Sequence, residues 1–210
     1  MDSLLKLLFP ERCAGCAKTG QLLCAACCQR LAPYPGKPRA LPGLSDVTIA
    51  YLYQSPLREA VHALKYRRRH RVAQPLGQLL GALVAEHAPR CVAVLPIPMH
   101  STRLAERGFN QAELIARAAA ADAGLPCLAQ GLSRMRGTAQ QAKLNARERQ
   151  ENMRGAFAWV AASAPPARVV LIDDVLTTGA TMSACALALR AAGCTEVYGI
   201  ALARSRPDLG

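Results

Sequence analysis

Short apolar runs alternate with longer amphipathic segments along most of the chain. The apolar runs have the length and composition of buried strands, and strands are predicted at residues 47–53, 91–97, 156–160, 169–172 and 196–203. Apolar positions with helical spacing predict helices over residues 56–64, 75–86, 111–123 and 179–192. Strands that alternate with helices are typical of an α/β fold, in which helices flank both faces of a mostly parallel sheet.

Boundary residues and a basic segment refine this pattern. Ser55 and Pro56 are expected as the N-cap and the first residue of a helix, and Gly124 and Gly193 are expected to end two others. Residues 133–154 are basic and poor in apolar side chains, which predicts an exposed loop. A loop of this length inside a domain is commonly a lid or a binding loop.

The composition divides the chain into three predicted parts. Residues 1–32 hold a cysteine-rich module with a short N-terminal helix, residues 33–46 form a linker rich in proline and glycine, and residues 47–210 form the α/β domain. No run of 18 or more apolar residues occurs, and the apolar patch in residues 1–10 is too short for a secretory signal. We therefore expect a cytoplasmic protein without a membrane span.

A pair of Cys-x-x-Cys motifs stands near the N-terminus. Of the nine cysteines in the chain, these motifs contain Cys13, Cys16, Cys24 and Cys27. Two such hairpins can place four thiolates at the corners of a tetrahedron around Zn²⁺, whereas a redox motif would not come as a pair. The sequence therefore predicts a structural zinc site, with Cys28 as an alternative to Cys27 for the fourth ligand.

An excess of basic residues favours a polyanionic partner. The chain has 26 lysine and arginine residues against 14 acidic ones, which gives a formal net charge of +12. The basic residues gather in two segments, residues 65–71 and 134–154. Phosphorylated metabolites and nucleic acid both suit such a charge, so the charge does not choose between them.

The segment from residue 169 to residue 182 carries the strongest chemical pattern. A buried strand is expected to end at Asp173 and Asp174, and a turn then leads into a helix that starts with Thr177, Thr178, Gly179, Ala180 and Thr181. Such a helix start suits a phosphate, because it offers free N–H groups, close backbone approach and hydroxyl donors. The two carboxylates can accept hydrogen bonds from ribose hydroxyls and help to hold a hydrated Mg²⁺.

In order and spacing, this segment resembles the signature with which type I phosphoribosyltransferases bind 5-phosphoribosyl 1-pyrophosphate (PRPP). The resemblance implies a type I phosphoribosyltransferase fold that binds PRPP with Mg²⁺ and uses Asp173 and Asp174 as its catalytic residues. The implied PRPP-binding residues in this segment are Asp173, Asp174, Val175, Thr177, Thr178, Gly179, Ala180 and Thr181. Purine-salvage members typically have an aspartate at the position of Thr177, so this chain departs from their pattern and a hypoxanthine or guanine substrate is disfavoured.

Further segments resemble the ComF family of competence-associated proteins. They are Leu-Lys-Tyr-Arg at residues 64–67, the stretch from Pro96 to Gln111, and the run at residues 138–157. With the cysteine module, the resemblance extends over most of the chain. It implies that the pyrophosphate of PRPP contacts Lys65, Arg67, Arg103 and Arg107. It also implies a mobile flap that carries Lys143, Arg147 and Arg149.

Two functions stay open at this point. The first is an enzyme that transfers the phosphoribosyl group of PRPP to an unidentified acceptor with the help of Mg²⁺, in a reaction that needs mainly positioning and charge neutralisation. The second is a non-catalytic module that senses PRPP or associates with single-stranded DNA. The family resemblance implies a role in DNA uptake or utilisation, beside a competence helicase. Binding of PRPP would depend on Mg²⁺ and on Asp174, whereas DNA binding would depend steeply on salt.

Overall fold

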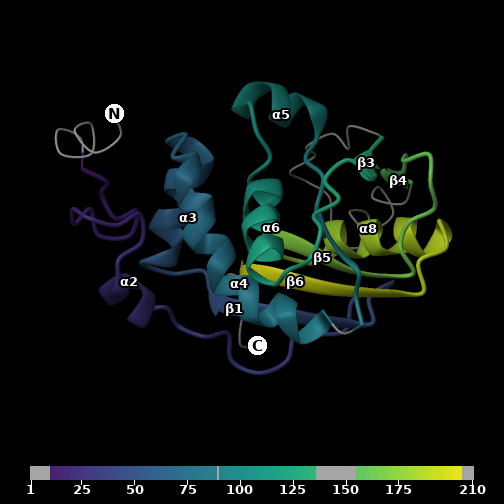
Figure 1. Cartoon of the computed structure of the whole chain (residues 1–210), viewed down its shortest axis with the longest axis horizontal. Coiled ribbons are helices and arrows are strands. Elements are labelled where there is room, and N and C mark those ends of the chain that lie inside the picture. Colours follow the sequence, from purple (N-terminus) through teal and green to yellow (C-terminus); the bar gives the residue numbers. More distant parts are fainter. Residues whose placement is uncertain (1–9, 89, 136–154, 205–210) are drawn as a thin grey trace.

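A four-stranded parallel sheet lies at the centre of the molecule (Figure 1). The computed structural model describes residues 10–88, 90–135 and 155–204. Within these residues the strands of the sheet follow the order β1-β6-β5-β2, and every neighbouring pair is parallel. The strands are β1 (Asp46–Leu52), β2 (Ala93–Pro96), β5 (Arg168–Leu176) and β6 (Glu196–Arg204).

Helices cover both faces of this sheet. They are α3 (Leu57–Tyr66), the 3-10 turn η1 (His70–Val72), α4 (Ala73–His87) and α6 (Gln111–Asp122) on one face, and α8 (Ala180–Ala191) on the other. Along β5, Val170 and Ile172 pack into the first core and Val169 and Leu171 into the second, because side chains alternate along a strand. The predicted α/β architecture is confirmed. None of the described helices has both the length and the apolar character needed to cross a membrane.

Two of the predicted strands differ from expectation. Strand β5 does not end before the carboxylates but contains Asp173 and Asp174, since its backbone stays paired with β6 as far as Leu176. The strand predicted at residues 156–160 is present as β4 (Phe157–Trp159), but it pairs antiparallel with β3 (Leu132–Arg134) in a separate two-stranded sheet. The start of the predicted basic loop is therefore a strand.

Three helices begin where the sequence did not place them. Helix α5 (Ser101–Arg107) was not predicted, because it buries none of its residues and so shows no apolar period. Helix α8 begins at Ala180 rather than at the threonines before it, since its N-cap Gly179 has a left-handed φ of 80°. Helix α3 begins at Leu57, and its N-cap is Pro56 rather than the serine before it.

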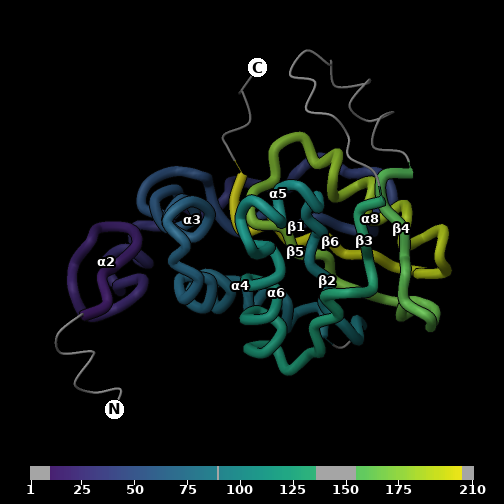
Figure 2. The backbone as a smooth tube through the Cα atoms, turned by 90° about the horizontal axis from the view of Figure 1, so that it is seen from above, coloured from purple at the N-terminus to yellow at the C-terminus, as the bar shows by residue number. Residues whose placement is uncertain are grey.

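The cysteine module lies at one end of the molecule, beside α3 (Figures 1 and 2). Its short helix α2 spans Ala25–Gln29. A Cβ atom at Gly15 would lie 2.8 Å from Cβ of Pro56 and 2.9 Å from Sγ of Cys27, so a glycine is needed for this close approach. An ion pair between Glu11 and Arg71 adds a polar link. The module thus packs directly against the start of α3.

The segment that follows the module runs beside α8. Arg190 of α8 donates hydrogen bonds to the backbone oxygen of Gly43 (3.0 Å) and to Oγ of Ser45 (2.9 Å). Leu41 lies over Gly179, where a Cβ atom would be 2.5 Å from Cδ1 of the leucine. Residues 33–46 therefore contact the domain, and the division at residues 32 and 46 stays a prediction.

Candidate functional site

A cleft opens at the carboxyl end of β5, where ligands of open α/β sheets commonly bind. It consists of two adjoining cavities of about 230 Å³ and 530 Å³. The side chains that line both cavities are Lys65, Tyr66, Arg103 and Arg107. The smaller cavity reaches the acidic pair of β5, and the larger one is bounded further by Arg68 and Glu106.

Asp174 is almost fully buried beside the smaller cavity, with 4% of its side chain exposed. Its Oδ2 forms an ion pair with Nζ of Lys65, whose side chain is 16% exposed. Its Oδ1 accepts a hydrogen bond from Nε2 of Gln111 at 3.1 Å. A buried carboxylate requires such compensation, because an unpaired charge in a low-dielectric environment is costly.

Asp173 is half-buried and differs in its surroundings from Asp174. Since side chains alternate along β5, Asp173 faces the side of the sheet that α8 covers. Its Oδ1 accepts a hydrogen bond from the backbone N–H of Asp174 at 2.8 Å. Burial and, second, the neighbouring charge of Asp174 raise the pKa of Asp173 to about 8. At neutral pH this carboxyl group is therefore mainly protonated and can donate a hydrogen bond.

Arg107 links the acidic pair to the wall of the cleft. Its Nη1 donates a hydrogen bond to Oε1 of Gln111, the same side chain that donates to Asp174. Its guanidinium carbon lies 5.4 Å from the ring centroid of Tyr66, within range of a cation–π contact. Tyr66 is 65% exposed. An aromatic face and positive charge therefore stand together at the mouth of the cleft.

The structure brings together three of the four predicted pyrophosphate ligands. Lys65 reaches the cleft from α3, and Arg103 and Arg107 reach it from α5. Arg67, the C-cap of α3, is exposed and lines neither cavity. Its neighbour Arg68 lines the larger cavity instead, because the backbone turns there with a φ of 50°.

The predicted phosphate-binding turn places only part of its side chains in the cleft. Val175 and Thr181 line the smaller cavity beside the acidic pair. Thr177 and Thr178 are exposed and line neither cavity. Glycine is needed at residue 179 for the left-handed turn and for the contact with Leu41.

The cysteine thiols form a second candidate site. The Sγ atoms of Cys13, Cys16, Cys24 and Cys27 all lie within 4.8 Å of one another. The Cys13–Cys27 and Cys16–Cys24 pairs are each separated by 3.6 Å. Zinc–sulfur bonds of about 2.3 Å in a tetrahedron would separate the sulfurs by about 3.8 Å, so the four thiols fit one zinc ion. Cys28 lies outside this cluster, which favours Cys27 as the fourth ligand.

Backbone N–H groups stabilise the thiolate form of Cys13. Burial opposes ionisation of Cys13, but the backbone N–H groups of Cys24, Cys16 and Gly15 outweigh it and lower the pKa of the thiol to about 6. The N–H group of Cys24 lies 3.3 Å from its Sγ. The thiolate is the form that binds zinc.

Curated relatives match most of the chain. DNA utilization protein YhgH of Salmonella typhi is 33% identical over 189 residues, which are 88% of this chain and 78% of the relative. Competence protein F of Haemophilus influenzae is 30% identical over 172 residues, 78% of this chain and 75% of the relative. The chain belongs to the ComF family. YhgH of Escherichia coli K12 is 31% identical over 95% of this ComF-family chain and 85% of its own length.

No family model matches the ComF-family chain. Among solved structures it is similar to the glutamine PRPP amidotransferase of B. subtilis, with 23% identity, a TM-score of 0.42, and coverage of 61% of this chain and 26% of that one. It is also similar to the orotate phosphoribosyltransferase of Aeropyrum pernix, with 20% identity, a TM-score of 0.38, and coverage of 72% and 66%. Both scores are low, so we infer the function from the cleft and from the sequence family.

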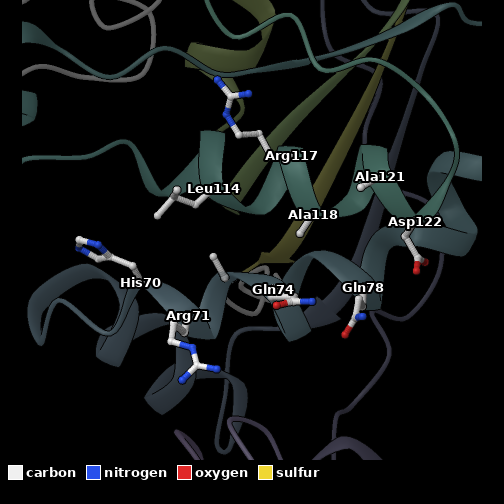
Figure 3. Close-up of a pocket in the computed structure, with 10 residues that line it drawn as sticks. His70, Arg71, Gln74, Gln78, Leu114, Arg117, Ala118, Ala121 and Asp122 are labelled. Atoms are coloured by element: carbon white, nitrogen blue, oxygen red, sulfur yellow. The ribbon is translucent and has the colours of Figure 1, made fainter. Parts of the chain in front are cut away.

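A third cavity, of about 570 Å³, lies between α4 and α6 of the ComF-family chain (Figure 3). Gln74 and Gln78 line it from α4, and Leu114 and Asp122 line it from α6. It shares no lining residue with the cleft and contains no pair of carboxylates. The cleft at β5 therefore remains the candidate site.

Two polar residues at the start of α6, Asn110 and Gln111, have contacts for which the sequence predicted no role. Asn110 accepts a hydrogen bond from the backbone N–H of Ala112 (3.1 Å) and donates one to the backbone oxygen of Ile97 (3.0 Å), which fixes the start of α6 beside the end of β2. Its position before a helical run is an N-cap signal that could have identified it. Nothing in the sequence indicates that Gln111 contacts Asp174.

The predicted flap falls mostly outside the structure described. Lys143, Arg147 and Arg149 lie in residues 136–154, outside the described residues. Arg134, at the start of the basic segment, lies in β3 and lines the smaller cavity. It is therefore a further cleft residue that the sequence did not single out.

Proposed function

We propose that the cleft binds PRPP. The supporting observation is that Asp173 and Asp174 share one cleft with Arg103 and Arg107, at the carboxyl edge of a parallel sheet. Carboxyl groups suit the hydroxyls of ribose, and guanidinium groups suit the oxygens of a pyrophosphate. The ribose would lie against the acidic pair, its 5-phosphate against the N-terminus of α8, and its pyrophosphate in the larger, basic cavity.

We further propose that the bound PRPP reacts with an acceptor. The bond between C1 of the ribose and the pyrophosphate oxygen breaks, pyrophosphate leaves with the bonding electrons, and a nucleophile of the acceptor forms the new bond to C1. Positive charge develops on the ribose and negative charge on the leaving group, so the cleft acts by positioning and by charge neutralisation. Arg103 and Arg107 would stabilise the leaving pyrophosphate, and Asp173 and Asp174 would orient the ribose.

The two metals predicted from the sequence differ in how well the residues fit them. The four-thiol cluster fits a structural zinc ion, which would hold the cysteine module together. Magnesium does not fit at Asp174 in this arrangement, since the ammonium group of Lys65 already neutralises this carboxylate and would repel a second cation beside it. We therefore derive no step of the reaction through Mg²⁺.

A second function is favoured by the exposed ring of Tyr66. The ring stands among Arg68, Arg103 and Arg107, and stacking on an aromatic ring beside positive charge is a common way to bind single-stranded nucleic acid. The names of the relatives, competence protein F and DNA utilization protein, support a role in DNA uptake or utilisation. In this alternative the protein senses PRPP or binds single-stranded DNA in the cytoplasm, beside a competence helicase, without catalysis.

Calorimetry with PRPP tests the first function. We expect the full chain to bind PRPP and Asp174→Asn to weaken binding at least about tenfold, because the ribose loses a carboxylate partner. Asp46→Asn, which removes an exposed carboxylate of β1, is the matched control and should bind normally. Absence of binding by the full chain would refute the proposal.

The same variants separate the two functions. Binding of a fluorescent single-stranded oligonucleotide should fall steeply with salt and be unchanged in Asp174→Asn. Tyr66→Ala should weaken DNA binding. If Asp174→Asn lost PRPP binding and DNA binding together, the two ligands would not bind in separate ways as proposed.

A further inference from the structure

The charge of Asp174 is compensated from within the protein. Oδ2 pairs with the ammonium group of Lys65, and Oδ1 accepts the N–H group of Gln111. Both members of the ion pair are shielded from water, since 16% of the lysine side chain and 4% of the aspartate side chain are exposed. Each oxygen of the carboxylate thus already has a donor or a cation.

Lys65 is held in this position by the helix that carries it. It lies in the last turn of α3, and its neighbours Ala63 and Leu64 are 2% and 0% exposed in the core. The backbone of Lys65 therefore cannot move away without opening that core. Its ammonium group is therefore a fixed cation beside the acidic pair. The carboxylate of Asp174 is neutralised without an ion from solution.

A divalent cation at Asp174 would compete directly with this lysine. A metal bound to either oxygen would lie a few ångströms from the ammonium group of Lys65, and two positive groups that close together in a buried site repel each other, whereas a ribose hydroxyl carries no such charge. Arg103 and Arg107, which line the same cavity, add to that repulsion. Charge and geometry both disfavour a metal at this carboxylate.

We infer that Lys65 takes the place of a divalent cation at Asp174, so that the cleft binds a phosphorylated ribose without a metal at this carboxylate. This differs from the magnesium dependence that the sequence predicted. The part of the inference that concerns the ligand rests on the proposed function. The part that concerns the cation does not, because it can be measured on the protein alone.

Binding of Mn²⁺ to the zinc-loaded full chain, followed by electron paramagnetic resonance of the free ion, tests the cation part. We expect Lys65→Met to bind one Mn²⁺ at least about tenfold more tightly than the wild type, because the carboxylate loses the ammonium group that neutralises it. The double variant Lys65→Met/Asp174→Asn should return to wild-type affinity. Lys37→Met, the same substitution at an exposed lysine, is the matched control and should leave Mn²⁺ binding unchanged.

Two results would overturn this inference. One is a folded Lys65→Met protein, judged by circular dichroism, that gains no Mn²⁺ affinity. The other is weaker Mn²⁺ binding by the single variant Asp174→Asn than by the wild type. That result would mean that the wild-type carboxylate already holds a metal. The second comparison decides the question even if Lys65→Met does not fold.

Calorimetry with PRPP tests the ligand part. In the zinc-loaded wild type we expect affinities in Mg²⁺-free buffer without chelator and in Mg²⁺ to agree within about threefold, whereas in Lys65→Met added Mg²⁺ should improve binding at least about tenfold. A wild-type protein that binds PRPP only with Mg²⁺ would contradict the inference. If PRPP does not bind under any condition, the proposed function fails, while the Mn²⁺ titration still decides the role of Lys65.

Discussion

Asp173→Asn should change how the stability of the protein depends on pH. In the folded protein, burial and the charge of Asp174 raise the pKa of Asp173 from 3.8 to about 8. Between these values the folded state holds a proton that the unfolded state releases. The stabilising contribution of Asp173 is therefore fully present below about pH 4 and is lost as the pH rises through about 8.

The size of the effect follows from the same pKa. With a folded-state pKa of about 8, the free energy of unfolding falls by at most about 4 kcal/mol when the pH rises from about 5 to about 9. Asp173 is only partly buried, so solvent screening reduces this value. We expect the wild type to lose about 2 kcal/mol across this range relative to Asp173→Asn.

Urea unfolding at a series of pH values measures this difference. Asn can keep the hydrogen bond from the backbone N–H of Asp174, so the variant removes the titrating proton and little else. Asp122→Asn, at an exposed position, should follow the wild-type curve. Curves for the wild type and Asp173→Asn that stay parallel within about 0.5 kcal/mol would refute the reasoning, as would a wild type that gains stability with pH relative to the variant.

Two further predictions concern the scaffold. At Gly77 a Cβ atom would lie 2.4 Å from Cβ of Ala118 and 2.6 Å from a backbone oxygen of α6, so Gly77→Ala should destabilise the protein by about 1–3 kcal/mol in urea unfolding. Gly81→Ala would meet the side chain of Asp122, whose carboxylate can rotate away although its Cβ atom at 2.9 Å cannot, so it should cost less than Gly77→Ala, since alanine also favours the helix; equal losses would contradict the packing argument. Removing zinc with a chelator, or Cys27→Ser, should lower the melting temperature, because Cys13, Cys24 and Cys27 share the core with α3. Cys28→Ser should not, and an equal effect of the two serine variants would contradict the assigned ligand set.

The parts of the fold that the sequence predicted well are those with a local signal. The apolar runs predicted the parallel strands, and the spacing of the cysteines predicted a cluster that the structure brings together. The end of β5 was predicted too early, because two aspartates look like the polar end of a strand. Pairing with β6 keeps them in the strand, and that pairing is a long-range property.

The site was predicted in outline but not in its contacts. Arg67 and Arg68 are adjacent basic residues, and only the left-handed turn at Arg68 decides which of them lines the cleft. The partners of Asp174 come from two different helices, so no local pattern connects Lys65 or Gln111 to it. Sequence alone could indicate a basic surface near an acidic pair, but not that one lysine would neutralise the buried carboxylate.

Helix α3 also connects the cysteine module to the cleft. The module packs on Pro56 at one end of the helix, and Lys65 projects from the other end into the cleft. Ten residues of α-helix form a rod of about 15 Å. A change in the folding of the module, such as loss of the zinc ion proposed for it, would shift or loosen this rod at its base and so disturb the ion pair at its tip. The thiols can thus influence the chemistry of the cleft although none of them lines it.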